Sequence, residues 1–222
     1  PSGQGPGVAR FALLGPQRRP SKATPKLKRK NSKKQMKRFV TPEQLRSYSY
    51  RLANNVLLDD FTPDFMVAIW RGGATIGICM HEFFKYLGKD VDHIAIRTSR
   101  YTGIDETKSQ VAVHNLGYLL ERMNKNSKVL LVDDVYDSGL SIDAIFTNLR
   151  EKMGENMPED IRVATIYYKP TRNKTTRVPN YFISESDEWI VFPHELEGLT
   201  LPEIEKVFGP ELVDLISSHT KK

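Results

Sequence analysis

One stretch of the chain combines a buried strand, adjacent carboxylates and the start of a helix. It reads Val129-Leu-Leu-Val-Asp133-Asp134-Val-Tyr-Asp137-Ser138-Gly139-Leu-Ser141. Its four apolar residues predict a buried strand that ends in two carboxylates, and open α/β sheets place ligands at that end of a strand. A turn with a glycine and two hydroxyl groups follows, and then a helix begins. The backbone N–H groups and the positive end of that helix favour a bound phosphate.

The two adjacent acids add groups that suit the sugar of a phosphorylated ligand. Asp133 and Asp134 can accept hydrogen bonds from ribose hydroxyls or bind a hydrated Mg²⁺. In the alternative interpretation this is an ordinary strand–helix junction, where Asp137 or Ser138 only caps the helix. The length of the pattern favours a sugar-phosphate site over a simple cap.

Apolar strands alternate with helical patterns along most of the chain. Strands are expected at 65–70, 91–98, 128–133 and 161–168, with shorter ones at 181–184 and 189–192. Helices are expected from a capping box at Thr41 to about residue 56, then at 75–87, 138–152 and 201–217, the last interrupted at Gly209. This alternation predicts an α/β fold with a mostly parallel central sheet flanked by helices.

The charge is divided between two parts of the chain. Residues 1–42 hold 12 of the 33 Lys and Arg residues and no acid, which leaves 21 basic and all 27 acidic residues in the remainder. We expect 1–38 to be a disordered basic tail and 39–222 to form one folded domain. Because that domain has a net charge of −6, nucleic-acid binding is expected only through the tail. A plain solvated extension and an organellar targeting peptide are the alternatives for the tail.

The single cysteine, Cys79, excludes a disulfide framework and indicates a reducing compartment. No apolar run approaches the roughly 18 residues that a membrane span requires. We therefore expect a cytoplasmic protein without a membrane partner.

The pattern at 129–141 resembles the 5-phosphoribosyl-1-pyrophosphate (PRPP) signature of the type I phosphoribosyltransferases. Trp70-Arg71-Gly72-Gly73 follows the first long strand, where this family has its pyrophosphate loop. Lys169, at the end of a later strand, and the segment 187–195 resemble the purine end of the 6-oxopurine branch, especially its xanthine–guanine and hypoxanthine–guanine enzymes. The resemblance covers residues 41–196, so it assigns no role to the helix expected at 201–217.

The resemblance implies a role for each matching residue. Asp137 would be the general base at purine N7, the purine would contact Lys169, Trp189 and Ile190, and Mg²⁺ would bind Asp133, Asp134 and Glu195. A mobile loop at 99–112, with Ser99, Arg100 and Tyr101, would close over the site. The alternatives are core packing for Trp189, a solvated strand end for Lys169 and an exposed turn for Arg71. The implied PRPP contacts are Arg71, Gly72, Gly73, Asp133, Asp134, Asp137, Ser138, Gly139, Leu140 and Ser141.

The family match also implies a fold and an activity. The fold would be the type I phosphoribosyltransferase fold with a small base-binding hood, in a homodimer or homotetramer. The activity would be Mg²⁺-dependent transfer of the phosphoribosyl group of PRPP to hypoxanthine, guanine or xanthine in purine salvage, with a nucleoside monophosphate and pyrophosphate as products. The alternative is a PRPP-sensing regulator that binds nucleic acid through the basic tail. Asp137, Lys169 and Trp189 favour the enzyme, because a regulator has no need of them.

Overall fold

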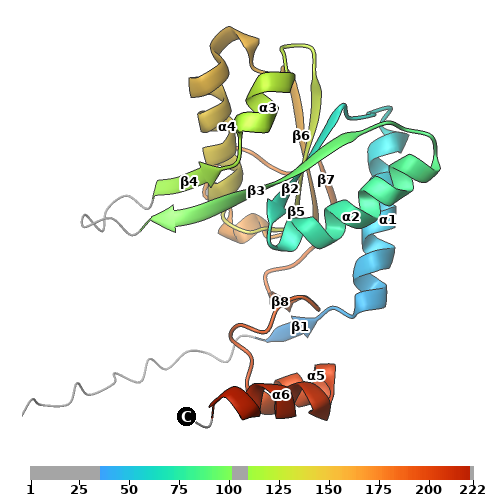
Figure 1. Cartoon of the computed structure of the whole chain (residues 1–222), viewed down its shortest axis with the longest axis vertical. Coiled ribbons are helices and arrows are strands. Elements are labelled where there is room, and N and C mark those ends of the chain that lie inside the picture. Colours follow the sequence, from blue (N-terminus) through green and yellow to red (C-terminus); the bar gives the residue numbers. More distant parts are fainter. Residues whose placement is uncertain (1–35, 102–109, 221–222) are drawn as a thin grey trace, which may run out of the picture. The chain divides into compact units, whose positions relative to one another are not determined.

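The fold is built around a six-stranded sheet with the order β4-β3-β2-β5-β6-β7 (Figure 1). The computed structural model describes residues 36–101 and 110–220. Of these strands, only β4 runs antiparallel to its neighbour, as the alternation of strands and helices predicts for a mostly parallel sheet. The strands are β2 (Phe65–Trp70), β3 (Asp92–Tyr101), β4 (Gln110–His114), β5 (Lys128–Tyr136), β6 (Asp160–Tyr168) and β7 (Tyr181–Glu185).

Helices cover both faces of this sheet. The buried side chains of α1 and α2 form one apolar cluster with β5 and β6, and those of α3 and α4 form a second cluster on the opposite face. The alternating side chains of β5 explain this division, because Leu130 joins the first cluster and Leu131 the second. The helices are α1 (Pro42–Leu58), α2 (Gly72–Tyr86), α3 (Gly117–Arg122) and α4 (Leu140–Met153), with short 3₁₀ turns at Gly154–Asn156 and Pro170–Arg172.

The N-terminus of α1 has the capping box that the sequence predicts. The side chain of Thr41 accepts a hydrogen bond from the Gln44 backbone N–H at 3.2 Å, and the Gln44 side chain accepts one from the Thr41 backbone at 3.0 Å. Two donors at the start of the helix are thereby satisfied.

A smaller two-stranded sheet lies outside the main one. Strand β1 (Lys37–Phe39) pairs in parallel with β8 (Trp189–Val191), and the Val40 N–H extends the pairing to the Val191 carbonyl at 2.9 Å. Two helices follow, α5 (Leu201–Phe208) and α6 (Pro210–Thr220), separated at Gly209 as the sequence indicates.

Several elements differ from the sequence-based expectation. The boundary expected at residue 38 falls inside β1, so regular structure begins earlier than the composition indicates. The segment expected to be a loop at 99–112 contains the end of β3 and most of β4, and its residues 102–109 lie outside the described part. Helix α3 was not predicted, because six residues are too few for a helical period to stand out. Within the described residues, no helix is long and apolar enough to cross a membrane.

Candidate active site

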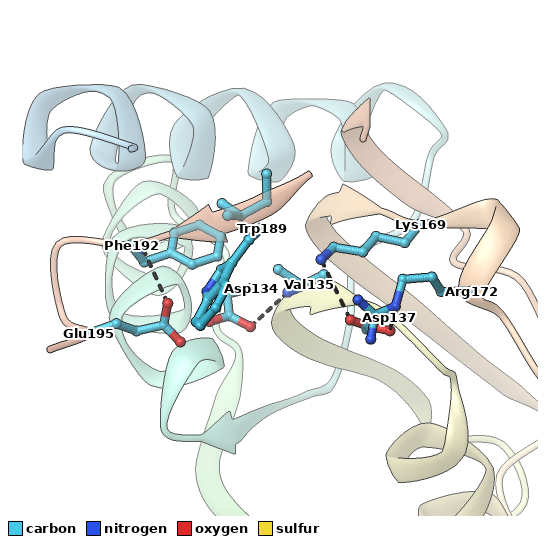
Figure 2. Close-up of a pocket in the computed structure, with 9 residues that line it drawn as sticks. Asp134, Val135, Asp137, Lys169, Arg172, Trp189, Phe192 and Glu195 are labelled. Carbon is cyan, nitrogen blue, oxygen red and sulfur yellow. Dashed lines mark hydrogen bonds and ion pairs between the residues drawn. The ribbon is translucent and has the colours of Figure 1, made fainter. Parts of the chain in front are cut away.

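A cavity of about 490 Å³ lies where β5, β6 and β8 end (Figure 2). This volume is within the range of about 300–1,000 Å³ that is usual for small-molecule sites. The residues that line it come from the segments that the sequence singles out, together with Arg172. The full lining is Asp134, Val135, Asp137, Lys169, Arg172, Trp189, Ile190, Phe192 and Glu195.

Sheet register brings Asp137 and Lys169 together. Tyr136 of β5 pairs with Tyr168 of β6, so the next residue of each strand lies at the same edge of the sheet. The Lys169 Nζ lies 3.5 Å from Asp137 Oδ2, and the Arg172 Nε lies 2.8 Å from Oδ1 (Figure 2). Lys169 is only 5% exposed, so it is not a solvated strand end.

This arrangement provides a proton acceptor and a hydrogen-bond donor next to each other in one cavity. Arg172 is not predicted from the sequence, where its only signal is its place three residues after Lys169, a weak pattern.

The turn before α4, which follows Asp137, presents an uncapped helix N-terminus. Gly139 has a φ of +74°, and no side chain caps the helix that begins after it. A Cβ at Gly139 would lie 2.6 Å from Thr175 Oγ1, so the turn has no room for a side chain there. The Lys174 N–H donates to the Ser138 carbonyl at 3.0 Å, and this hydrogen bond stabilises the turn. Ser138, Gly139, Leu140 and Ser141 therefore lie where an anion can accept from backbone N–H groups.

The loop after β2 packs directly on the strand that carries the acids. A Cβ at Gly72 would lie 1.9 Å from Asp134 Oδ2, and one at Gly73 would lie 2.1 Å from the Val132 carbonyl oxygen. Both positions thus require glycine for the loop to approach β5 so closely. Arg71, joined to Trp70 by a cis peptide bond, is exposed and pairs with Glu197 at 3.3 Å. Its guanidinium is accessible to an anionic ligand.

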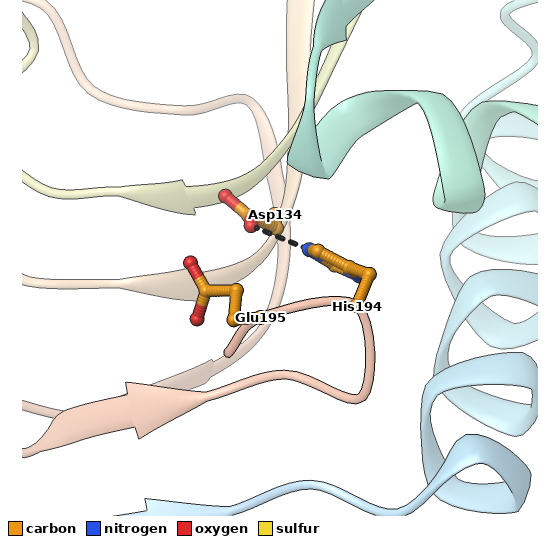
Figure 3. A group of neighbouring side chains, drawn as sticks. All are labelled: Asp134, His194 and Glu195. Atoms are coloured by element: carbon orange, nitrogen blue, oxygen red, sulfur yellow. Dashed lines mark hydrogen bonds and ion pairs between the residues drawn. The ribbon is translucent and has the colours of Figure 1, made fainter. Parts of the chain in front are cut away.

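Two of the three predicted metal ligands meet, together with a histidine (Figure 3). One ligand atom from each of Asp134, His194 and Glu195 lies within 4.8 Å of the others, and His194 Nε2 is 3.3 Å from Asp134 Oδ2. Burial raises the pKa of Glu195, whose carboxylate accepts from the Phe192 N–H at 3.3 Å. Carboxylate oxygens on a partly buried surface fit a divalent cation such as Mg²⁺.

Asp133 is not part of that group of three. Its Oδ1 accepts a hydrogen bond from the Asp134 N–H at 3.0 Å. Burial, and then the neighbouring negative charge of Asp134, raise the pKa of Asp133 well above its ordinary value. Such a carboxyl favours a ligand that offers hydrogen-bond donors, such as sugar hydroxyls.

The predicted purine contacts form one wall of the cavity. Trp189 is 39% exposed and lines the cavity, so core packing does not account for it. Ile190 also lines the cavity and is buried. Of the expected closing loop, Ser99 contacts His114 Nε2 through its hydroxyl at 3.0 Å, and Arg100 and Tyr101 continue β3.

The chain matches the family model described as "Phosphoribosyl transferase domain" over residues 41–198. A search of curated proteins finds no significant match. Among solved structures, it is similar to a purine phosphoribosyltransferase from Pyrococcus horikoshii, with 26% identity and a TM-score of 0.58 over 74% of this chain and 97% of that one.

Two further structures share the fold at lower identity. One is a hypothetical protein from Neisseria gonorrhoeae with bound ppGpp, with 19% identity and a TM-score of 0.61 over 78% of this chain and 96% of that one. The other is the xanthine-guanine-hypoxanthine phosphoribosyltransferase of Helicobacter pylori, with 21% identity and a TM-score of 0.56 over 82% and 99% of the two chains.

Proposed function

Because this chain belongs to the phosphoribosyltransferase family, we propose that it transfers the 5-phosphoribosyl group of PRPP to a 6-oxopurine. Hypoxanthine, guanine and xanthine are the candidate acceptors, and the products are a nucleoside monophosphate and pyrophosphate. The reaction would serve purine salvage in the cytoplasm. The observation that carries the proposal is the meeting of Asp137 and Lys169 in one cavity, with Trp189 in its wall.

The residues proposed to contact the purine are the reason for proposing a base with an oxygen at position 6. The Lys169 ammonium has only donors, so it suits the oxygen at position 6 of the base. Asp137 would accept the proton from N7 while N9 attacks the anomeric carbon of PRPP. Arg172, 2.8 Å from Asp137, would hold that carboxylate in place, and Trp189 would lie against the face of the ring.

PRPP would be bound by backbone N–H donors and by charged side chains. The N–H groups of Asp137 to Ser141 would bind the 5-phosphate, and this remote contact would align the reacting carbon. Asp133 and Asp134 would accept from the ribose hydroxyls. Arg71 would bind the departing pyrophosphate, close to the backbone of Gly72 and Gly73.

A divalent cation fits the proposal at the acidic end of the cavity. Asp134 and Glu195, with His194 beside them, would hold Mg²⁺. Asp133, expected from the sequence as a third ligand, lies outside this group and is left to the ribose hydroxyls. When bound, the cation supplies positive charge against the pyrophosphate. PRPP and the purine base are therefore the proposed small-molecule partners.

The test is product formation by the full chain. The protein is incubated with PRPP, MgCl₂ and hypoxanthine, and pyrophosphate and nucleotide are measured together. We expect both to appear in equal amounts and only when all three components are present. Saturable binding of PRPP, with no product from hypoxanthine or, in parallel reactions, from guanine or xanthine, would contradict the enzyme and support the regulator. In that case RNA and DNA binding by the tail would be measured next.

A further inference from the structure

Two segments outside the family match meet beside Trp189, one of the residues that line the cavity. The match covers residues 41–198, whereas Lys37 lies in β1 and Glu203 lies in the first turn of α5. The Lys37 ammonium donates to Glu203 Oε2 at 2.8 Å, to Glu203 Oε1 at 3.0 Å and to the Gly198 carbonyl at 3.0 Å. The N-terminal strand and the C-terminal helix are thus joined through one lysine.

Lys37 also contacts Trp189, the aromatic wall of the cavity. Its Nζ lies 5.0 Å from the centroid of the Trp189 ring, within the range of a cation–π interaction. The backbones pair as well, because Lys37 is in register with Trp189 and the Trp189 N–H donates to the Met36 carbonyl at 3.2 Å. The lysine and the tryptophan are therefore held together by both side chain and main chain.

The surroundings leave this pair little freedom. A Cβ at Gly198, where φ is +81°, would lie 2.9 Å from two ring atoms of Trp189, so the indole packs directly against that backbone. Glu203 is held in turn, because it accepts from the Thr200 N–H at 2.8 Å as part of a capping box. The Lys37 side chain is only 17% exposed, which is low for a lysine. Its three contacts fix the ammonium in one place rather than leaving it in solvent.

We propose that Lys37 is a positioning residue for purine recognition, which sets the Trp189 ring against the base and is itself held by Glu203. The inference rests on the proposed function, because Trp189 acts on a base only if the cavity receives one. An indole that is free to turn stacks less well on a flat ring, whereas the phosphate and ribose contacts lie on other elements. The chain outside 41–198 thus contributes to base affinity and not to PRPP affinity.

Steady-state kinetics of the full chain test this separation. Lys37→Met keeps most of the side-chain length but removes the charge, and Lys206→Met changes an exposed lysine of α5 as the matched control. From the strength of a cation–π contact we expect the KM for hypoxanthine to rise about 3- to 30-fold in Lys37→Met. The KM for PRPP and kcat should stay within about twofold. Lys37→Arg should restore most of the purine affinity, and Glu203→Gln should lose part of it.

Fluorescence gives a second measurement that needs no turnover. The chain has two tryptophans, so Trp70→Phe leaves Trp189 as the only source of tryptophan fluorescence. Hypoxanthine should quench this emission, and adding Lys37→Met should weaken binding by the factor seen in KM.

An unchanged hypoxanthine affinity, or equal losses for hypoxanthine and PRPP, would overturn the inference. Weaker hypoxanthine binding in Lys37→Met, with no turnover by the unaltered chain, would overturn the proposed function and leave the inference standing. A chain that neither turns over nor binds hypoxanthine would overturn both.

Discussion

At the scale of single residues, the proposed chemistry depends on the Asp137 carboxylate between Lys169 and Arg172. Asp137→Asn keeps the shape but removes the proton acceptor, so we expect kcat to fall by about 10²–10⁴. PRPP affinity should change little, because the turn's N–H groups remain. Asp143→Asn, on the adjoining helix and paired with Arg177, is the control and should keep full activity. An Asp137→Asn rate within about threefold of the unaltered protein would remove the base from the mechanism.

The glycine in the phosphate turn gives a second test at this scale. Gly139→Ala places a Cβ 2.6 Å from Thr175 Oγ1 at a positive φ, so the turn must shift and the KM for PRPP should rise at least about tenfold. Gly154→Ala is the matched control, because Gly154 also has a positive φ but nothing lies within 4 Å of its Cβ position. Both variants should lose some thermal stability, measured as Tm. Only Gly139→Ala should lose PRPP affinity, and equal KM values in the two variants would contradict a phosphate role for this turn.

At the scale of elements, the sequence predicts what local patterns encode and misses what distant contacts create. The long apolar strands, the capping box of α1 and the turn before α4 all carry local signals, so each is visible before folding. Strand β1 has only three residues and exists through its pairing with β8, about 150 residues later. The roles of Lys37 and Arg172 cannot be predicted from the sequence either, because the fold and not their spacing in the chain determines which residues they contact.

The link between β1 and α5 has a predictable dependence on pH. The Lys37 hydrogen bond, followed by the Thr200 N–H, lowers the pKa of Glu203 from 4.5 to about 2. Because the folded-state pKa is below the unfolded value, this contribution to stability is present above about pH 4.5 and is lost as the pH falls towards 2. Amide hydrogen exchange in α5 should be faster in Glu203→Gln than in the unaltered chain from pH 5 to 8. This difference should shrink below about pH 4.5, and a difference that grows with acid would contradict the ion pair.

At the scale of the whole molecule, we propose that the chain assembles into a homodimer or homotetramer, with exposed apolar side chains around α2 in the contact. Trp70 is 57% exposed, Ile78 67% and Tyr86 89%. Contiguous apolar patches mark contact sites, and Trp70 and Ile78 line the same surface pocket. Light scattering after size exclusion should give at least twice the 25.4 kDa of one chain.

Charge placed on that surface should disrupt the assembly. Ile78→Lys should reduce the mass towards that of one chain, whereas Leu58→Lys, at a more exposed apolar site at the end of α1, should not. A single-chain mass for the unaltered protein would contradict the prediction.

The most direct test of the central claim compares adenine with hypoxanthine as acceptors for the full chain, with PRPP and Mg²⁺ held constant. The buried Lys169 ammonium faces the cavity and can only donate, and adenine presents a donor amino group where hypoxanthine presents an acceptor oxygen. A site built for one hydrogen-bond pattern rejects the opposite pattern by orders of magnitude, so we expect kcat/KM for adenine to be at least about 10³-fold lower. Comparable kcat/KM values for the two bases would contradict the assignment of a 6-oxopurine phosphoribosyltransferase.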